Sequence, residues 1–140
     1  MFVLDTNVVS ELIRPTPEPS VTAWVAGHAS SSLFLTAVNE AEIRFGVAIM
    51  KVGARREAVS AAIDALVRED FAGRILPFDS DAAVAYATLA ARRRAAGRPV
   101  AQADAQIAAI AAVNAMAVVT RNTADFVDTG VDIVNPWPAG

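Results

Sequence analysis

Short apolar runs alternate along this chain with longer segments of helical periodicity. Polar residues bound each short run, which is typical of buried strands, and this pattern predicts strands at residues 2–4, 33–36, 74–78, 117–120 and 131–134. The segments between them predict helices at residues 8–13, 20–27, 37–50, 55–71, 81–96 and 101–115. Because strands and helices alternate throughout, we expect an α/β fold in which helices cover both faces of a parallel sheet. Pro77 favours an edge position for the third strand.

Composition narrows the class of protein. The length favours a single domain, residues 1–140, and 54% hydrophobic with 19% charged residues excludes a disordered chain. The chain has no cysteine, which excludes thiolate metal sites and fits a reducing cytoplasm. It begins without a basic segment and a long apolar run, and charges interrupt its apolar runs, so we expect neither a signal peptide nor a membrane span. The net charge of -3 argues against a general nucleic-acid binder.

Asp5 is the first candidate site residue, because it directly follows the first predicted strand. In α/β proteins, ligands bind at the carboxyl edge of the sheet, at the point where the strand order reverses. The alternative is a structural role, in which Asp5 only caps the helix at 8–13.

Glu42 is the second candidate, because the pattern places it among apolar residues of the helix at 37–50. The predicted apolar stripe of this helix contains Val38, Phe45 and Ile49. Glu42 falls inside this stripe and Glu40 on the opposite side. An ionised carboxylate on a buried face is costly unless it is paired or bound to a cation. The alternative for Glu42 is a buried salt bridge to Arg44 or Arg121.

Two further polar residues have a similar placement. Asp104 lies in the first turns of the helix at 101–115, where a negative charge also suits the helix dipole, and Asn122 follows the fourth strand. The architecture can bring both together with Asp5 and Glu42 at the carboxyl edge of the sheet. Oxygen ligands without Cys or His select hard cations, Mg²⁺ or Mn²⁺, and such ions can activate water at a phosphate.

Four segments carry a resemblance to a known family. They are Val3–Asn7, the helix around Glu42, Ala103–Ala108, and Val119–Asn122 with Asp125 and Phe126. In their order and spacing they resemble the PIN-domain ribonucleases, specifically the VapC and FitB-like toxins of bacterial toxin–antitoxin pairs. The resemblance covers essentially the whole chain. It implies a three-layer fold with a five-stranded parallel sheet ordered 3-2-1-4-5, Mg²⁺-dependent cleavage of RNA in the cytoplasm, a homodimer, and inhibition by a partner antitoxin.

The resemblance also implies a role for each site residue by motif match. Asp5 and Asp104 hold Mg²⁺ directly. Glu42 helps to bind the ion or deprotonates the attacking water, and Asn122 orients a water. Many members carry a fourth Asp at the position of Asn122, so this chain has one negative charge fewer and a weaker case for a second metal ion. Three residues are expected to support these four: Thr6, Thr120 and Asp125.

A basic cluster lies at the end of the helix at 81–96. It comprises Arg92, Arg93, Arg94 and Arg98. A charged helix end is usually a solvated one, and cations here also suit the negative pole of the helix dipole. The alternative is that these arginines hold RNA phosphates beside the acidic sites of a dimer.

Two other functions stay open. An aspartyl phosphatase also has an Asp at the end of its first strand, but that chemistry needs a second acid two residues on, where this chain has Asn7. A catalytically weakened PIN-type module would only bind RNA or its partner. Retention of the three acids argues against such a module, and Asn122 argues slightly for it. Metal titration separates the enzyme from the module.

Overall fold

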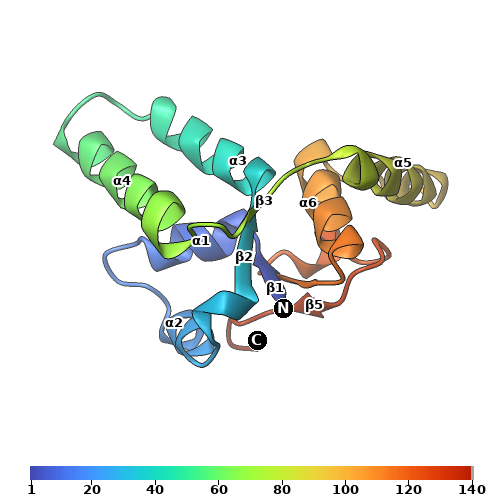
Figure 1. Cartoon of the computed structure of the whole chain (residues 1–140), viewed down its shortest axis with the longest axis horizontal. Coiled ribbons are helices and arrows are strands. Elements are labelled where there is room, and N and C mark those ends of the chain that lie inside the picture. Colours follow the sequence, from blue (N-terminus) through green and yellow to red (C-terminus); the bar gives the residue numbers. More distant parts are fainter. Residues whose placement is uncertain (140) are drawn as a thin grey trace.

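The computed structural model describes residues 1–139 and contains a five-stranded parallel sheet in the order β3-β2-β1-β4-β5 (Figure 1). The strands are β1 (Phe2–Leu4), β2 (Leu33–Thr36), β3 (Ile75–Leu76), β4 (Ala117–Val119) and β5 (Ile133–Val134). The predicted α/β class and strand order are confirmed, and β3 lies at an edge as Pro77 indicated. Both edge strands are shorter than predicted, because each has only one neighbour with which to pair.

β1 lies at the centre of the sheet and pairs in parallel on both sides. Val3 stands opposite Phe34 of β2 and Val118 of β4. The backbone N–H of Asp5 extends the ladder to the carbonyl oxygen of Val119 at 2.9 Å. The chain runs from β1 through β2 to β3 on one side and then crosses over to β4 on the other side of β1. Asp5 therefore lies at the switch point of the strand order.

The α-helices within residues 1–139 are α1 (Thr6–Leu12), α2 (Pro19–Ala26), α3 (Ala37–Ala48), α4 (Ala54–Ala65), α5 (Ser80–Ala95) and α6 (Gln102–Val113). Two short 3₁₀ turns, η1 (Ser30–Ser32) and η3 (Thr123–Asp125), and one π-helical turn, η2 (Leu66–Asp70), complete the described elements. The helix predicted at 55–71 is therefore two elements, α4 and η2. No helix in the described residues is long and apolar enough to cross a membrane.

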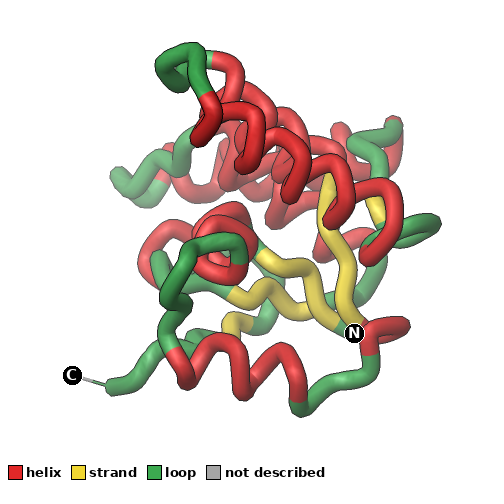
Figure 2. Tube along the Cα trace, turned by 90° about the vertical axis from the view of Figure 1, so that its left-hand side faces the viewer, coloured by secondary structure: helices red, strands yellow, loops and turns green. Residues whose placement is uncertain are grey.

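The sheet has a hydrophobic core on each face, because alternate residues of each strand point to opposite sides. Leu4, Leu35 and Val119 pack with residues of α1, α2, α3 and α4 on one face. Val3 and Val118 pack with α5 and α6 on the other. Figure 2 shows the strands lying between helices on either side. This is the three-layer arrangement that the sequence predicted.

α3 buries a different side from the one that the apolar pattern indicated. Phe45 and Ile49 are 66% and 68% exposed, whereas Asn39 and Ile43 are buried. The physical reason is a capping box at the start of α3, in which Thr36 and Asn39 hydrogen-bond each other's backbone amide. These bonds turn a polar residue toward the core, which an apolar pattern cannot register.

Candidate functional site

A polar cavity of about 400 Å³ opens at the carboxyl edge of the sheet. Its lining includes all four predicted site residues, Asp5, Glu42, Asp104 and Asn122. They come from separate parts of the chain: the β1–α1 junction, the second turn of α3, the first turn of α6, and the segment after β4. The structure thus brings together side chains that lie more than a hundred positions apart at the extremes.

Asp5 is buried and held by both of its carboxylate oxygens. Oδ1 accepts from the backbone N–H of Thr6 at 2.8 Å, which caps α1. Oδ2 accepts from Oγ1 of Thr120 at 2.8 Å and from Nδ2 of Asn7 at 3.2 Å. Asp5 therefore caps the helix, as its structural alternative predicted. Capping is compatible with a place in the cavity, because it fixes the position of the carboxylate.

Asn7 also lines the cavity, although sequence analysis assigned it no part in the acidic site. Its amide donates to Asp5 and, at 3.1 Å, to Oγ1 of Thr120. Its Oδ1 accepts from the backbone N–H of Arg121 at 3.3 Å. Asn7 therefore ties the start of α1 to the segment after β4. Its position two residues after Asp5, in the first turn of the capped helix, is the signal that sequence reasoning left unused.

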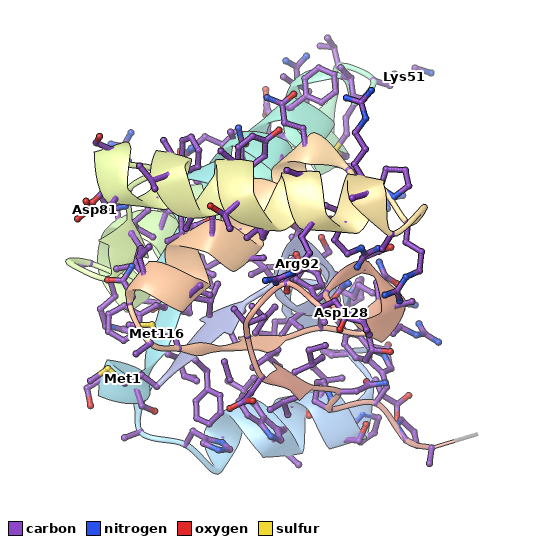
Figure 3. The ribbon with its side chains drawn as sticks, turned by 90° about the vertical axis from the view of Figure 1, so that its right-hand side faces the viewer. Met1, Lys51, Asp81, Arg92, Met116 and Asp128 are labelled. Carbon is purple, nitrogen blue, oxygen red and sulfur yellow. The ribbon has the colours of Figure 1, made fainter. Side chains whose placement is uncertain are left out.

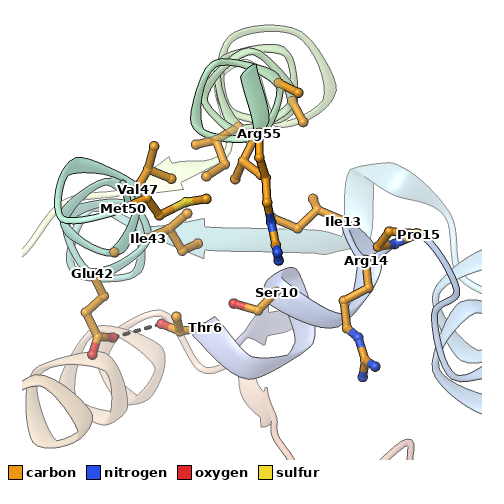
Figure 4. Close-up of a pocket in the computed structure, with 15 residues that line it drawn as sticks. Thr6, Ser10, Ile13, Arg14, Pro15, Glu42, Ile43, Val47, Met50 and Arg55 are labelled. Carbon is orange, nitrogen blue, oxygen red and sulfur yellow. Dashed lines mark hydrogen bonds between the residues drawn. The ribbon is translucent and has the colours of Figure 1, made fainter. Parts of the chain in front are cut away.

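Glu42 is half-buried and held by a chain of hydrogen bonds. Nδ2 of Asn39 donates to Oγ1 of Thr6 at 3.1 Å. The Thr6 hydroxyl in turn donates to Oε1 of Glu42 at 2.8 Å, as Figure 4 shows. The Thr6 hydroxyl therefore orients Glu42 as the Thr120 hydroxyl orients Asp5.

Glu42 does not form the alternative salt bridge to Arg44, so that prediction is wrong. The Arg44 guanidinium pairs instead with Glu40 at 2.7 Å and with Asp64 at 2.9 Å. The Arg121 guanidinium lies over the ring of Trp137, 5.4 Å from its centroid. Glu42 thus faces the cavity from the edge of α3, with its hydrogen bond from Thr6.

Two acids of the cavity, Asp5 and Asp104, have raised pKa values. Burial raises the pKa of Asp5 above its ordinary value, against the hydrogen bonds from Thr120 and Thr6, and the charges of Glu42 and Asp125 raise it further. Burial also raises the pKa of Asp104 to about 6, with added repulsion from Asp5, Asp125 and Glu42. Asp125 therefore belongs electrostatically to the same group of acids.

The donor atoms fit a hard divalent cation. Carboxylate and carboxamide oxygens face the cavity, with no His or Cys in its lining, and such donors suit Mg²⁺ or Mn²⁺. Within residues 1–139, no group of three or more His, Cys, Asp or Glu side chains is placed to hold a metal ion. Mg²⁺ needs fewer protein ligands, because this ion keeps several waters and is usually bound through one or two carboxylates.

The predicted basic cluster does not line the cavity. Arg92, Arg94 and Arg98 are exposed, and Arg93 is only 6% exposed. The guanidinium of Arg93 is bonded to backbone carbonyls, so it is not accessible to a phosphate. The prediction that the four arginines hold RNA phosphates does not fit Arg93, because its guanidinium is buried.

A second, larger hollow adjoins the acidic cavity. This apolar groove of about 860 Å³ lies between α1, α3 and α4, and it shares Thr6, Ser10, Arg14 and Glu42 with the cavity. Figure 4 shows the side chain of Arg55 reaching from α4 toward Ser10. The groove therefore adjoins the cavity that contains the acids.

Comparison with known proteins shows the family. The sequence matches the PIN domain over residues 2–131, and the chain belongs to this family. Among named relatives, it is 43% identical over 137 residues to VapC ribonuclease Y4jK of Sinorhizobium fredii, with 98% of both chains covered. It is 38% identical over 137 residues to toxin FitB of Neisseria gonorrhoeae, covering 98% of this chain and 99% of the relative.

The solved structures agree with the sequence comparison. A structure of FitAB bound to an IR36 DNA fragment contains a chain with a TM-score of 0.92 and 38% identity, covering 100% of this chain and 98% of that one. FitAcB from Neisseria gonorrhoeae gives a TM-score of 0.87 at 36% identity, with 98% and 99% covered. The chain is therefore a VapC/FitB-like member of the PIN-domain family, as the sequence motifs indicated.

Proposed function

We propose that this chain is a metal-dependent endoribonuclease toxin of a toxin–antitoxin pair, which hydrolyses RNA phosphodiester bonds with Mg²⁺ or Mn²⁺. The proposal rests on one observation, which is that the same cavity is lined by Asp5, Glu42, Asp104 and Asn122. Relatives that are named as a VapC ribonuclease and a toxin support it. The proposal treats residues 1–140 as one PIN domain that acts in the cytoplasm, where its RNA substrate is found.

Each side chain has one task in the proposed mechanism. A bound Mg²⁺ supplies Lewis-acid stabilisation of the charge that develops on the scissile phosphate. Asp5 and Asp104 hold the cation through their carboxylate oxygens. Glu42, oriented by the Thr6 hydroxyl, takes the proton of the attacking water. The carboxamide of Asn122 orients that water.

The supporting residues keep the carboxylates in place. The hydroxyls of Thr120 and Thr6 each donate to one acid, and such outer contacts fix the direction of a ligand's free lone pairs. Asp125 adds negative charge beside Asp5 and Asp104. A cation that enters the cavity relieves this repulsion.

A metal titration of RNA cleavage tests the proposal. We expect a fluorescent RNA to stay intact in excess chelator and to be cleaved as Mg²⁺ or Mn²⁺ is added. The Asp5→Asn variant keeps the size and capping ability of the side chain, so it should lose nearly all cleavage while keeping the wild-type circular dichroism spectrum. Full activity in chelator, or in this variant, would contradict the metal mechanism.

A catalytically weakened module that binds RNA or its partner is the second candidate. The observation that favours it is Asn122, which lines the cavity as a neutral side chain. Binding of RNA without cleavage at any metal concentration would select it. A phosphatase is not proposed, because the position two residues after Asp5 holds Asn7, whose amide donates to that carboxylate.

The proposed protein partner is an antitoxin. The similar solved structures include FitAB and FitAcB. The proposed binding surface for a segment of the antitoxin is the apolar groove beside the acids.

We also propose that the toxin forms a homodimer through the outer face of α3, where Phe45 and Ile49 are exposed. Arg92, Arg94 and Arg98 remain the proposed contacts for RNA phosphates.

A further inference from the structure

Arg93 is a buried cation at the end of α5, behind the acidic cavity. Its side chain is 6% exposed, and it forms no ion pair with any acid in the described part of the chain. A buried charge is costly unless its surroundings compensate it. For Arg93 the compensation comes from backbone carbonyl oxygens.

The guanidinium of Arg93 bridges two segments. Nε donates to the carbonyl oxygen of Arg98 at 2.6 Å. Nη1 donates to that of Val127 at 2.6 Å, with longer contacts to Ala124 at 3.3 Å and Asp125 at 3.4 Å. The planar fork of an arginine suits such a divergent set of acceptors, which a lysine ammonium cannot match.

Both segments lead to residues of the cavity. Arg98 lies in the connection that enters α6, and α6 carries Asp104 in its first turn. Ala124 and Val127 lie in the connection after β4, where Asn122 precedes the turn η3 and Asp125 is its last residue. One side chain is therefore bonded to the segment that leads to Asp104 and to the segment that carries Asn122 and Asp125.

Two neighbouring arginines hold the same connection. Arg92 donates to the carbonyl oxygen of Asp128 at 2.8 Å, and Arg98 pairs with the Asp128 carboxylate. Figure 3 shows Arg92 and Asp128 close together under α5. Asp128 has a φ of 58°, in the left-handed region that Asp adopts more often than most non-glycine residues. The connection is therefore held in a specific shape from the α5 side.

We propose that Arg93 is a positioning residue, which holds the α6 entry and the β4–β5 connection at the spacing that the acidic cavity needs. It touches neither RNA nor metal. Removal of its guanidinium should loosen the segment that carries Asn122 and Asp125 and weaken cation binding, without affecting Asp5 and Glu42 on the other side of the cavity. The catalytic part of this proposal rests on the proposed ribonuclease function.

The test compares Arg93→Ala and Arg93→Lys with a matched control, Arg94→Ala. Arg94 is the next residue and is exposed, and its side chain makes no hydrogen bond or ion pair with any residue from 1 to 139. Hydrogen–deuterium exchange is measured by segment, and the Mg²⁺ concentration for half-maximal RNA cleavage is measured separately from the maximal rate. The exchange measurement needs no activity.

We expect Arg93→Ala to speed exchange at residues 98–104 and 122–130, while residues 2–12 keep wild-type exchange. We also expect it to raise the Mg²⁺ requirement about 10- to 100-fold, the usual effect of losing an outer contact of a metal site. Arg93→Lys should recover part of both effects. Arg94→Ala should match the wild type in exchange, and it serves as a control for that measurement alone, because Arg94 is a proposed RNA contact.

Either of two results would overturn the proposal. One is faster exchange spread evenly over the chain, which would make Arg93 a general stabiliser. The other is a wild-type Mg²⁺ requirement despite faster local exchange. If Arg93→Ala fails to fold, Arg93→Lys decides by the same criteria. If the wild type cleaves no RNA, the proposed function fails, and the exchange pattern still decides whether Arg93 holds the two segments.

Discussion

Asp5 caps α1 with one carboxylate oxygen and accepts hydrogen bonds from Thr120 and Asn7 with the other. Hydrogen bonds from N–H groups normally lower the pKa of a capping carboxylate, because they stabilise its negative charge. Here burial outweighs these bonds, and the pKa of Asp5 is raised. A carboxylate that is fixed in place and still insufficiently solvated is suited to bind a cation.

Glu42→Gln tests the acid that faces the cavity from α3, with Glu40→Gln as its control on the same helix. Glu42 accepts from Thr6, whereas Glu40 pairs with Arg44. Loss of a proton acceptor typically lowers the rate by about 10²- to 10⁴-fold. We expect this fall in the maximal rate of RNA cleavage for Glu42→Gln and a near wild-type rate for Glu40→Gln. Equal effects of the two changes would contradict the role of Glu42.

Sequence reasoning located the acids and missed the amides that hold them. Asp5 and Asp104 stood out at a strand end and a helix start, Glu42 stood out because it interrupts an apolar pattern, and the family resemblance grouped the three. Asn7 and Asn39 did not, since a lone Asn is common in turns and caps. Their role depends on contacts with Thr120 and Thr6 across 113 and 33 positions, and local sequence does not encode these contacts.

The ends of helices and strands position the site residues, and α3 is the clearest example. Its capping box joins Thr36 to Asn39, and Asn39 also donates to Thr6. The start of α3 is therefore linked to the start of α1, which fixes the rotation of α3 and the direction of Glu42. The strand order was predictable through the family resemblance. The rotation of α3 was not, because a buried polar residue sets it.

Asn39→Ala tests the link between α3 and α1. The change leaves the buried backbone N–H of Thr36 without its acceptor, which typically costs about 1–3 kcal/mol. We expect the free energy of unfolding in urea to fall by this amount. We also expect slower RNA cleavage than in the wild type at saturating Mg²⁺, because Thr6 no longer holds Glu42 in one orientation. Unchanged stability would show that the capping box does not fix α3.

The outer face of α3 bears on how whole molecules associate, because it is apolar and exposed in the single chain. Phe45 and Ile49 are each about two-thirds exposed, which is unusual for large apolar side chains on one stripe. We expect light scattering to give a dimer at micromolar concentration and Phe45→Glu to give a monomer. Val113→Glu, a similar change at a residue 43% exposed on α6, should stay dimeric. A monomeric wild type would contradict the proposed dimer.

The stability of the whole molecule should depend on pH and metal through the same acids. The folded pKa of Asp104 is about 6 against an ordinary 3.8, and the pKa of Asp5 is raised as well. At pH values between 3.8 and about 6, Asp104 binds more protons in the folded state than in the unfolded state. The metal-free protein should therefore gain stability as pH falls from 8 through about 6, until the unfolded pKa is reached.

Thermal melts from pH 8 to 5, with chelator and with Mg²⁺, check this prediction. Asp64 does not interfere, because its hydrogen bond from Arg44 lowers its pKa and its effect falls below this pH range. Mg²⁺ that binds only the folded state should add about 2.7 kcal/mol at a hundredfold excess over its dissociation constant. A metal-free melting temperature that falls steadily from pH 8 to 5 would contradict the shared acidic site.

Calorimetric titration with Mn²⁺ at pH 7.5 tests most directly whether Asp5, Glu42, Asp104 and Asn122 form one cation site. The account predicts that the wild type binds Mn²⁺, that Mg²⁺ competes, and that Asp5→Asn and Asp104→Asn each weaken binding strongly while the folded spectrum is kept. Glu40→Gln should bind as the wild type does. Equal Mn²⁺ affinity in the wild type and both variants, or no binding to the wild type at all, would contradict it.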